Sequence, residues 1–163
     1  MPWWRVICWC CNRDMNKNSP DPKNESAEHE DDEASCRSSY KLLYNKHGFF
    51  LSMDTEGNIF GTKEKHKHAN FNFLTSDGEG VRIKAVSADK YVAMDEQGNL
   101  YGQDDPNSDE TLFIENIEGY YLQYQSKNYQ DWFIGIKKTG KPKKGTKTKS
   151  RQRAVMWLKT DCS

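Results

Sequence analysis

Residues 50–61, with the sequence FLSMDTEGNIFG, recur as YVAMDEQGNLYG at residues 91–102. A weaker third copy, WFIGIKKTGK, occupies residues 132–141, and successive copies begin 41 residues apart. A fixed period of this size is typical of repeat architectures. Whatever the three copies share is then required by the fold, so a feature that one copy alone carries marks a candidate functional site.

Each copy predicts a hairpin with flanking strands. A short apolar run leads into a turn with glycine at its fourth position, and in the first two copies an apolar pair follows, which is typical of a tight β-hairpin. Each unit also opens and closes with a further strand-like run, and no segment shows convincing helical periodicity. The opening runs are 41–44, 81–86 and 121–124, and the closing runs are 71–74, 112–115 and 155–158.

Twelve short strands in three units must hide their edges, and a propeller usually needs at least four blades. We therefore expect an all-β β-trefoil of three four-stranded repeats, in which a six-stranded barrel is closed by a hairpin triplet. The repeats place this domain at residues 40–161. The expected core comprises Leu43, Leu51, Met53, Phe73, Ile83, Val92, Met94, Leu112, Ile114, Ile134, Ile136, Met156 and Leu158.

The segment before the repeats has a different composition. Residues 12–39 lack apolar periodicity, and residues 19–36 carry seven acids against one lysine. Such a segment cannot bury enough apolar surface to offset its ordering entropy. We therefore expect residues 1–39 to form a disordered tail that is acidic in its second half.

Five cysteines lie outside the repeats, at positions 8, 10, 11, 36 and 162. Their odd number argues against a disulfide framework and favours a core held by apolar packing alone. The apolar run 6–11 is shorter than a signal-peptide core, and no stretch is long enough to span a membrane. We expect no cleaved export signal. The first eleven residues are either an unstructured end or a site of reversible acylation.

The third copy differs from the others in charge. Its turn, Lys137-Lys138-Thr139-Gly140-Lys141, keeps the glycine but replaces the acids of the first two turns with lysines, and a longer loop follows. Residues 137–153 hold nine bases and no acid, although the whole chain has 24 basic and 24 acidic residues. Positive charge confined in this way favours binding of a polyanion, with an affinity that falls steeply as salt rises.

The loop contains no aromatic residue between positions 137 and 153. Single-stranded nucleic acids are usually bound with aromatic side chains that stack on bases, so a sulfated glycan fits this loop better than a nucleic acid. Lysines can meet sulfate groups as point charges. Two other readings are a nuclear-import signal and a merely solvated basic loop.

Several phrases of the chain, taken together, resemble the fibroblast growth factors. They are Leu43-Tyr44-x-x-x-Gly48-x-Phe50-Leu51, Asp54-x-x-Gly57-x-Ile59-x-Gly61-Thr62, Tyr91-Val92-Ala93-Met94, Asn99-Leu100-Tyr101-Gly102, Trp132-Phe133-Ile134-Gly135 and Lys137-Lys138-Thr139-Gly140-x-x-Lys143-x-Gly145-x-Lys147-Thr148. The resemblance covers about residues 40–160 and also implies a β-trefoil. It further implies an extracellular ligand, exported without a cleavable signal, that binds heparan sulfate and a receptor tyrosine kinase and promotes cell proliferation and differentiation.

Position by position, the resemblance also implies two surfaces. The heparin-binding residues would be His47, Lys137, Lys138, Lys143, Lys147, Gln152, Arg153 and Ala154, the last through its backbone. The receptor-binding residues would be Tyr44, Lys63, Glu115, Tyr121 and Leu158. The ligand would be a monomer alone and dimeric with receptor and glycan, with heparan sulfate as co-ligand and with no cofactor, metal or nucleic acid.

Other functions remain as alternatives. One branch of the same family stays inside the cell and binds cytoplasmic partners such as channel tails, and the absence of a signal peptide would suit it. A cytoplasmic or nuclear location is open on this reading. A lectin trefoil would repeat a Gln-x-Trp motif in each unit, and no such repeat is present here. The four histidines lie in the tail or in expected loops, so an oriented catalytic set is not expected.

Overall fold

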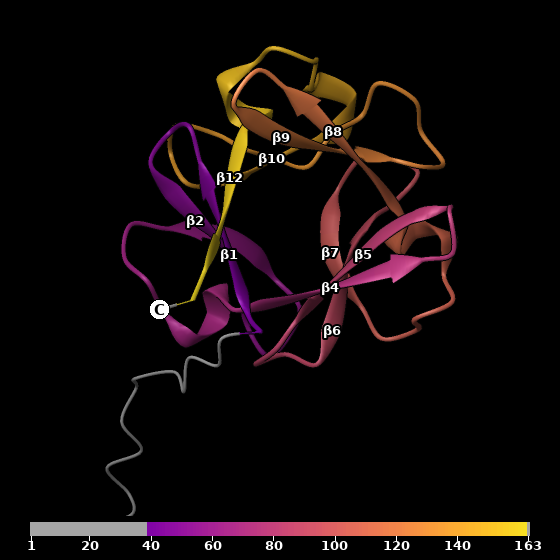
Figure 1. The fold of residues 1–163 in the computed structure, drawn as a ribbon, viewed down its shortest axis with the longest axis horizontal. Helices are drawn as coiled ribbons and strands as arrows, with labels where there is room; N and C mark the ends of the chain where they lie inside the picture. The colour runs from indigo at the N-terminus through magenta and orange to yellow at the C-terminus, as the bar shows by residue number, and fades with distance from the viewer. Residues whose placement is uncertain (1–38, 163) are drawn as a thin grey trace, which may run out of the picture. The chain divides into compact units, whose positions relative to one another are not determined.

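The computed structural model describes residues 39–162. Residues 1–38 of the predicted tail lie outside this range. The described residues form strands joined by turns and four short 3-10 helices (Figure 1). The strands are β1 (Lys41–Asn45), β2 (Phe49–Met53), β3 (Ile59–Thr62), β4 (Phe71–Ser76), β5 (Gly80–Ala85), β6 (Lys90–Met94), β7 (Leu100–Gln103), β8 (Phe113–Glu118), β9 (Tyr121–Ser126), β10 (Gly135–Ile136), β11 (Pro142–Lys143) and β12 (Trp157–Asp161). The 3-10 helices are η2 (Lys67–Ala69), η3 (Asp109–Thr111), η4 (Gly145–Lys147) and η5 (Arg153–Val155).

Six of the strands close into a barrel. Around the ring, β1 pairs with β4, β4 with β5, β5 with β8, β8 with β9, β9 with β12, and β12 with β1, always antiparallel. Closure leaves this ring without an open edge, which removes a template for aggregation. Figure 1 shows the three groups of strands arranged around a common centre. The predicted β-trefoil is confirmed.

The other six strands form three hairpins, β2–β3, β6–β7 and β10–β11. In the first turn the Asp54 carboxylate accepts hydrogen bonds from the Glu56 and Asn58 backbone N–H groups at 3.0 and 2.8 Å. Asp95 accepts the corresponding bonds from Gln97 and Asn99 at 2.9 and 2.8 Å. These carboxylates fix the first two turns by hydrogen bonding to their own backbone.

A ring of three backbone hydrogen bonds joins the hairpins to one another. The Gly102 N–H donates to the Gly57 carbonyl at 2.8 Å, the Gly145 N–H to the Gly98 carbonyl at 2.7 Å, and the Gly61 N–H to the Gly140 carbonyl at 2.7 Å. Each turn glycine is therefore bonded to the next hairpin, and the third hairpin returns to the first. This ring holds the hairpin triplet together.

Only glycine fits these positions. The turn glycines Gly57, Gly98 and Gly140 have φ values of 94°, 81° and 84°, which side-chain-bearing residues rarely adopt. A Cβ on Gly102 would lie 2.7 Å from the Gly57 Cα, and one on Gly98 would lie 2.9 Å from the Gly145 nitrogen. The glycines of the first two turns, and Gly102, are thus explained by close approach of one backbone to another.

The core follows the predicted alternation with two exceptions. Ile114 and Leu158, both expected in the core, are 38% and 39% exposed, because their neighbours Phe113 and Trp157 take the inward positions. Trp157 is fully buried and its Nε1 donates to the Ile134 carbonyl at 3.0 Å. Phe73 is only partly buried and packs against the main core cluster. The other expected core residues are buried.

The third unit is less regular than the first two. Within residues 132–136, where the repeat predicts a full strand, β10 covers only the last two residues. The preceding Phe133 forms an isolated bridge with Gln125, and its N–H donates to the Thr148 side chain at 2.9 Å. The longer loop of this unit therefore adds a side-chain hydrogen bond beside a shortened strand.

One cysteine also departs from expectation. Cys162 is disulfide-bonded, although the odd number of cysteines argued against a disulfide framework. The Cys162 N–H donates to the Tyr40 carbonyl at 3.0 Å, which fastens the end of the domain to its beginning.

Replacing Gly57 with alanine should destabilise the domain more than replacing Gly119. Both glycines have positive φ, but a Cβ at Gly57 would lie 3.2 Å from the Gly102 Cα, whereas nothing lies within 4 Å at Gly119. The backbone clash should add about 1–3 kcal/mol to the cost of the strained conformation that both variants share. Chemical denaturation of both variants measures the difference. Equal losses would mean that the glycine ring is not a packing constraint.

Candidate functional site

The third turn has the same backbone hydrogen bonds as the first two turns, although it lacks their carboxylates. The Lys137 N–H donates to the Lys141 carbonyl at 2.8 Å and the Gly140 N–H to the Lys137 carbonyl at 2.9 Å. Asp54 makes the equivalent backbone bonds in the first turn at 3.1 and 3.0 Å, to Asn58 and Gly57. Lys137 and Lys138 are exposed. The turn therefore forms without the acids, and its lysines point to a role other than folding.

The basic loop that follows is folded. Thr148 is buried, and its hydroxyl accepts from the Phe133 N–H at 2.9 Å and donates to the Gly145 carbonyl at 2.6 Å. The Gln152 side-chain oxygen accepts from the Lys143 Nζ at 2.9 Å and from the Lys149 N–H at 3.2 Å. A fixed backbone therefore presents the cations of this loop, which lowers the entropy lost when an anion binds.

Asn45, which the sequence analysis did not single out, joins this loop to the turn between β1 and β2. Its side chain is fully buried and donates to the carbonyls of Ala154 at 2.8 Å and Met156 at 3.3 Å. Its Oδ1 accepts from the His47 N–H at 2.9 Å. One buried amide thus sets the position of His47 relative to Ala154. A buried, bonded asparagine leaves no pattern in a single sequence that would have revealed it.

His47 lies among the cations of the loop. Its half-buried ring loses solvation, and Arg153, Lys143 and Lys138 act on it electrostatically, so its pKa lies below the ordinary value. Six of the predicted heparin-binding residues are linked by these interactions: His47, Lys138, Lys143, Gln152, Arg153 and Ala154. The other two, Lys137 in the third turn and Lys147 at the end of η4, are exposed.

Three of the predicted receptor residues form a row across neighbouring strands. Tyr44 of β1 is the register partner of Leu158 of β12. Tyr121 of β9 lies one position beyond the Trp157–Leu122 pair, on the other side of Leu158. We call Tyr44, Leu158 and Tyr121 the cross-strand row. Tyr44 also contacts Phe50 at 4.8 Å between ring centroids, and the Lys46 ammonium lies 4.5 Å from the centre of the Tyr121 ring.

Lys63 lies between the cross-strand row and the third turn. Its ammonium group is 3.9 Å from the centre of the Phe49 ring, and a Cβ on Gly140 would lie 3.0 Å from the edge of that ring. A Cβ on Gly48 would lie 3.8 Å from the Lys63 Nζ and 3.5 Å from the Tyr44 hydroxyl. Lys63 is therefore near Tyr44, as the resemblance implied, and also near the third turn.

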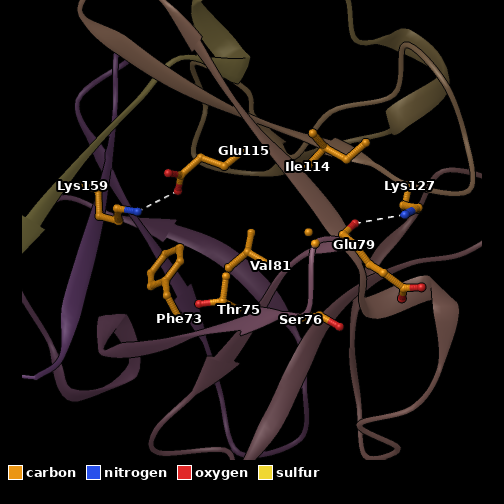
Figure 2. Close-up of a pocket in the computed structure, with 11 residues that line it drawn as sticks. Phe73, Thr75, Ser76, Glu79, Val81, Ile114, Glu115, Lys127 and Lys159 are labelled. Atoms are coloured by element: carbon orange, nitrogen blue, oxygen red, sulfur yellow. Dashed lines mark hydrogen bonds and ion pairs between the residues drawn. The ribbon is translucent and has the colours of Figure 1, made fainter.

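Glu115 is placed differently from the other predicted receptor residues. It lines a cavity of about 500 Å³ together with Phe73, Val81 and Ile114 (Figure 2). Its carboxylate accepts from the Tyr124 hydroxyl at 2.8 Å and from the Lys159 Nζ at 2.6 Å. Burial, and then the bond to Glu115, raise the pKa of Tyr124 above its ordinary value. The cavity was not foreseen, because the residues that line it come from four separate strands and the loops between them.

Within residues 39–162, no cluster of three or more metal-ligating side chains is placed to hold a metal ion. The described helices are also too short and polar for any of them to cross a membrane.

Comparison with known proteins shows the family of the chain. The sequence model of the fibroblast growth factor family matches residues 39–158. The chain belongs to the fibroblast growth factor family. It is 42% identical over 123 residues to fibroblast growth factor 1 of Xenopus laevis, covering 72% of this chain and 79% of the relative. It is 38% identical over 123 residues to the proteins of the same name from Notophthalmus viridescens and Cynops pyrrhogaster, covering 72% of this chain and 92% and 82% of those relatives.

Membership settles two of the expectations. The resemblance read from the sequence motifs is confirmed by the family match over three quarters of the chain. The growth factors of this family are not enzymes, as the sequence analysis expected.

Replacing Asn45 with alanine should cost this growth factor about 2 kcal/mol of stability. The variant leaves the buried carbonyl of Ala154 and the His47 N–H without their partner, and an unsatisfied buried polar group costs about 1–3 kcal/mol. Asn58→Ala is the matched control, because Asn58 is exposed and bonded only within its own turn. Urea unfolding compares the two. If Asn45→Ala is no worse than Asn58→Ala, the Asn45 amide does not anchor the loop.

Proposed function

We propose that this growth factor is a signalling ligand that binds heparan sulfate through its basic loop and activates a cell-surface receptor tyrosine kinase. The observation that carries the proposal is the third turn. It keeps the backbone hydrogen bonds of the other two turns while exposed lysines replace their carboxylates. Since folding does not require the exchange, binding of an anion is the best account of it.

The arrangement suits a sulfated glycan. The cations of the basic loop are held on a folded backbone, and Lys138, Lys143 and Arg153 act electrostatically on one half-buried ring, that of His47. A glycan chain carries sulfate groups in series, so several can meet these cations at once. With about four anions neutralised, and by analogy with single-stranded nucleic acid, log K should fall with log salt with a slope near −2.8.

Reversing the charge of three lysines should abolish heparin binding without unfolding the protein. The variant Lys138→Glu/Lys143→Glu/Lys147→Glu should lose retention on heparin resin, and its free energy of unfolding without heparin should change by less than about 1 kcal/mol, because these groups are solvent-accessible. The wild-type protein should leave heparin at higher salt than a generic cation exchanger.

A charge-matched comparison sharpens this test. Lys127 is also exposed, but it bonds to the Glu79 carbonyl beside the cavity of Figure 2. Lys127→Glu should therefore lower heparin retention much less than Lys138→Glu. Equal losses, or co-elution of the wild-type protein from the two resins, would show attraction by overall charge and rule out a glycan site.

The cross-strand row is the proposed centre of the receptor surface. Tyr44, Leu158 and Tyr121 come from three neighbouring strands and present two aromatic rings beside an exposed leucine. Aromatic side chains near the centre of an interface usually carry much of the binding energy. Lys63 extends this surface toward the glycan site. Glu115 would contribute only through the part of its carboxylate that does not bond to Lys159 or Tyr124.

Removing one ring of the row should weaken receptor binding strongly. Tyr121→Ala should cost about 2 kcal/mol or more in affinity for a receptor ectodomain if the ring is an anchor. Tyr91→Ala is the control, because Tyr91 is also half-buried below a lysine, Lys84, but lies in the second repeat. Surface plasmon resonance with immobilised ectodomain gives both values. A loss below about 0.5 kcal/mol for Tyr121→Ala would place the receptor surface elsewhere.

The proposed place of action is outside the cell. A disulfide at Cys162 suits an oxidising environment better than the cytosol. The alternative is the intracellular branch of the family, which binds cytoplasmic partners such as channel tails. Detection of the native protein in conditioned medium, together with receptor phosphorylation on added cells, supports the extracellular ligand. Retention in the cell without phosphorylation supports the alternative.

A further inference from the structure

His47 occupies an unusual place for an ionisable side chain. It lies in the turn between β1 and β2, and Asn45 fixes its backbone by accepting its N–H at 2.9 Å. The ring is half-buried, and three other elements bring cations toward it: Lys138 from the third turn, Lys143 from β11 and Arg153 from η5. The three charged groups that act on the ring are all positive.

The remaining charges near this turn are also positive. The Lys46 ammonium group lies over the Tyr121 ring and 3.7 Å from the Met156 sulfur. The Lys63 ammonium group lies near Gly48, the residue after His47. No carboxylate is among the groups that shift the His47 pKa. A protonated imidazole at this position would therefore add one more positive charge to a crowded set.

In the free protein this setting disfavours the charged form of the imidazole. Loss of solvation lowers the His47 pKa most, and the fields of Arg153, Lys143 and Lys138 lower it further. Both effects disfavour the charged ring. A polyanion that lies across the three cations changes the second effect, because its sulfate groups cancel their fields and add a negative charge beside the ring.

We propose that His47 takes up a proton when a sulfated glycan binds, so that this site holds its glycan more tightly as pH falls from about 7.5 to 5.5. The inference rests on the proposed glycan site and adds its regulation. Protonation would give the ring a second N–H donor for a sulfate oxygen, and the charge would be neutralised where it forms. Histidine is the side chain whose charge changes in this pH range.

The direction follows from linkage. His47 has a lower pKa in the free protein than in the glycan complex on this proposal. Between these two pKa values the complex holds more protons than the free protein, so affinity rises as pH falls through that window. One proton taken up changes affinity by at most about tenfold per pH unit. Well below the free-state pKa the ring is charged in both states, and the dependence disappears. We expect a gain of about three- to tenfold over the two units.

The test measures affinity for dextran sulfate and for heparin by calorimetry at pH 7.5, 6.5 and 5.5 at one ionic strength. Dextran sulfate carries only sulfate esters, which stay ionised throughout, so its pH dependence reports on the protein. The variant His47→Asn keeps a small polar side chain and the backbone bond to Asn45 but cannot titrate. The control His66→Asn removes an exposed histidine beside Lys65 and Lys67, in the loop before β4.

The expected result is tighter binding at pH 5.5 for the wild-type protein and His66→Asn, and pH-independent binding for His47→Asn. Proton uptake on binding, measured from the calorimetric enthalpy in two buffers of different ionisation enthalpy, should vanish in His47→Asn alone. Wild-type binding that does not change with pH, or a dependence that only His66→Asn removes, would overturn the inference. Absence of heparin binding at pH 7.5 would instead overturn the proposed glycan site itself.

Discussion

The structure depends on a ring of backbone hydrogen bonds between three turns. Each turn glycine offers its carbonyl to an N–H group of the next hairpin, and the third hairpin returns to the first at 2.7 Å. A Cβ on any of these six glycines would lie 2.6–3.2 Å from a neighbouring atom, and the turn glycines also have positive φ. Six glycines thus join three hairpins into one cap over a closed barrel. Because every unit must meet this requirement, the chain repeats with a nearly constant period.

The same requirement shows where the chain is free to vary. The ring fixes the backbone of each turn, but it leaves the exposed side chains at the turn tips unconstrained. The first two turns use carboxylates to hold their own backbone, whereas the third forms the same bonds without them. Lysines can therefore gather in the third turn and its loop without disturbing the barrel. Asn45 then brings His47 to the same place from the opposite end of the chain.

The sequence predicted the architecture well because its period, its turn glycines and its strand alternation all indicated one fold. It failed where two adjacent apolar residues competed for one inward position. Phe113 and Trp157 are buried, and Ile114 and Leu158 are exposed, because the larger ring fills the interior in each pair. The basic loop was predicted from charge alone, because residues 137–153 contain nine basic residues and no acidic one. Asn45, the cavity beside Glu115 and the junction at Lys63 depend on contacts between distant strands, which no local pattern encodes.

The central claim is that the third turn and its loop form an anion site that the fold does not need. Amide chemical shifts of the labelled protein during titration with a heparin oligosaccharide test it most directly. The account predicts perturbations centred on residues 137–154 and the turn 46–48, with the amide of Gly57 unchanged. Perturbations spread evenly over the barrel, or centred on the cavity beside Glu115, would contradict it.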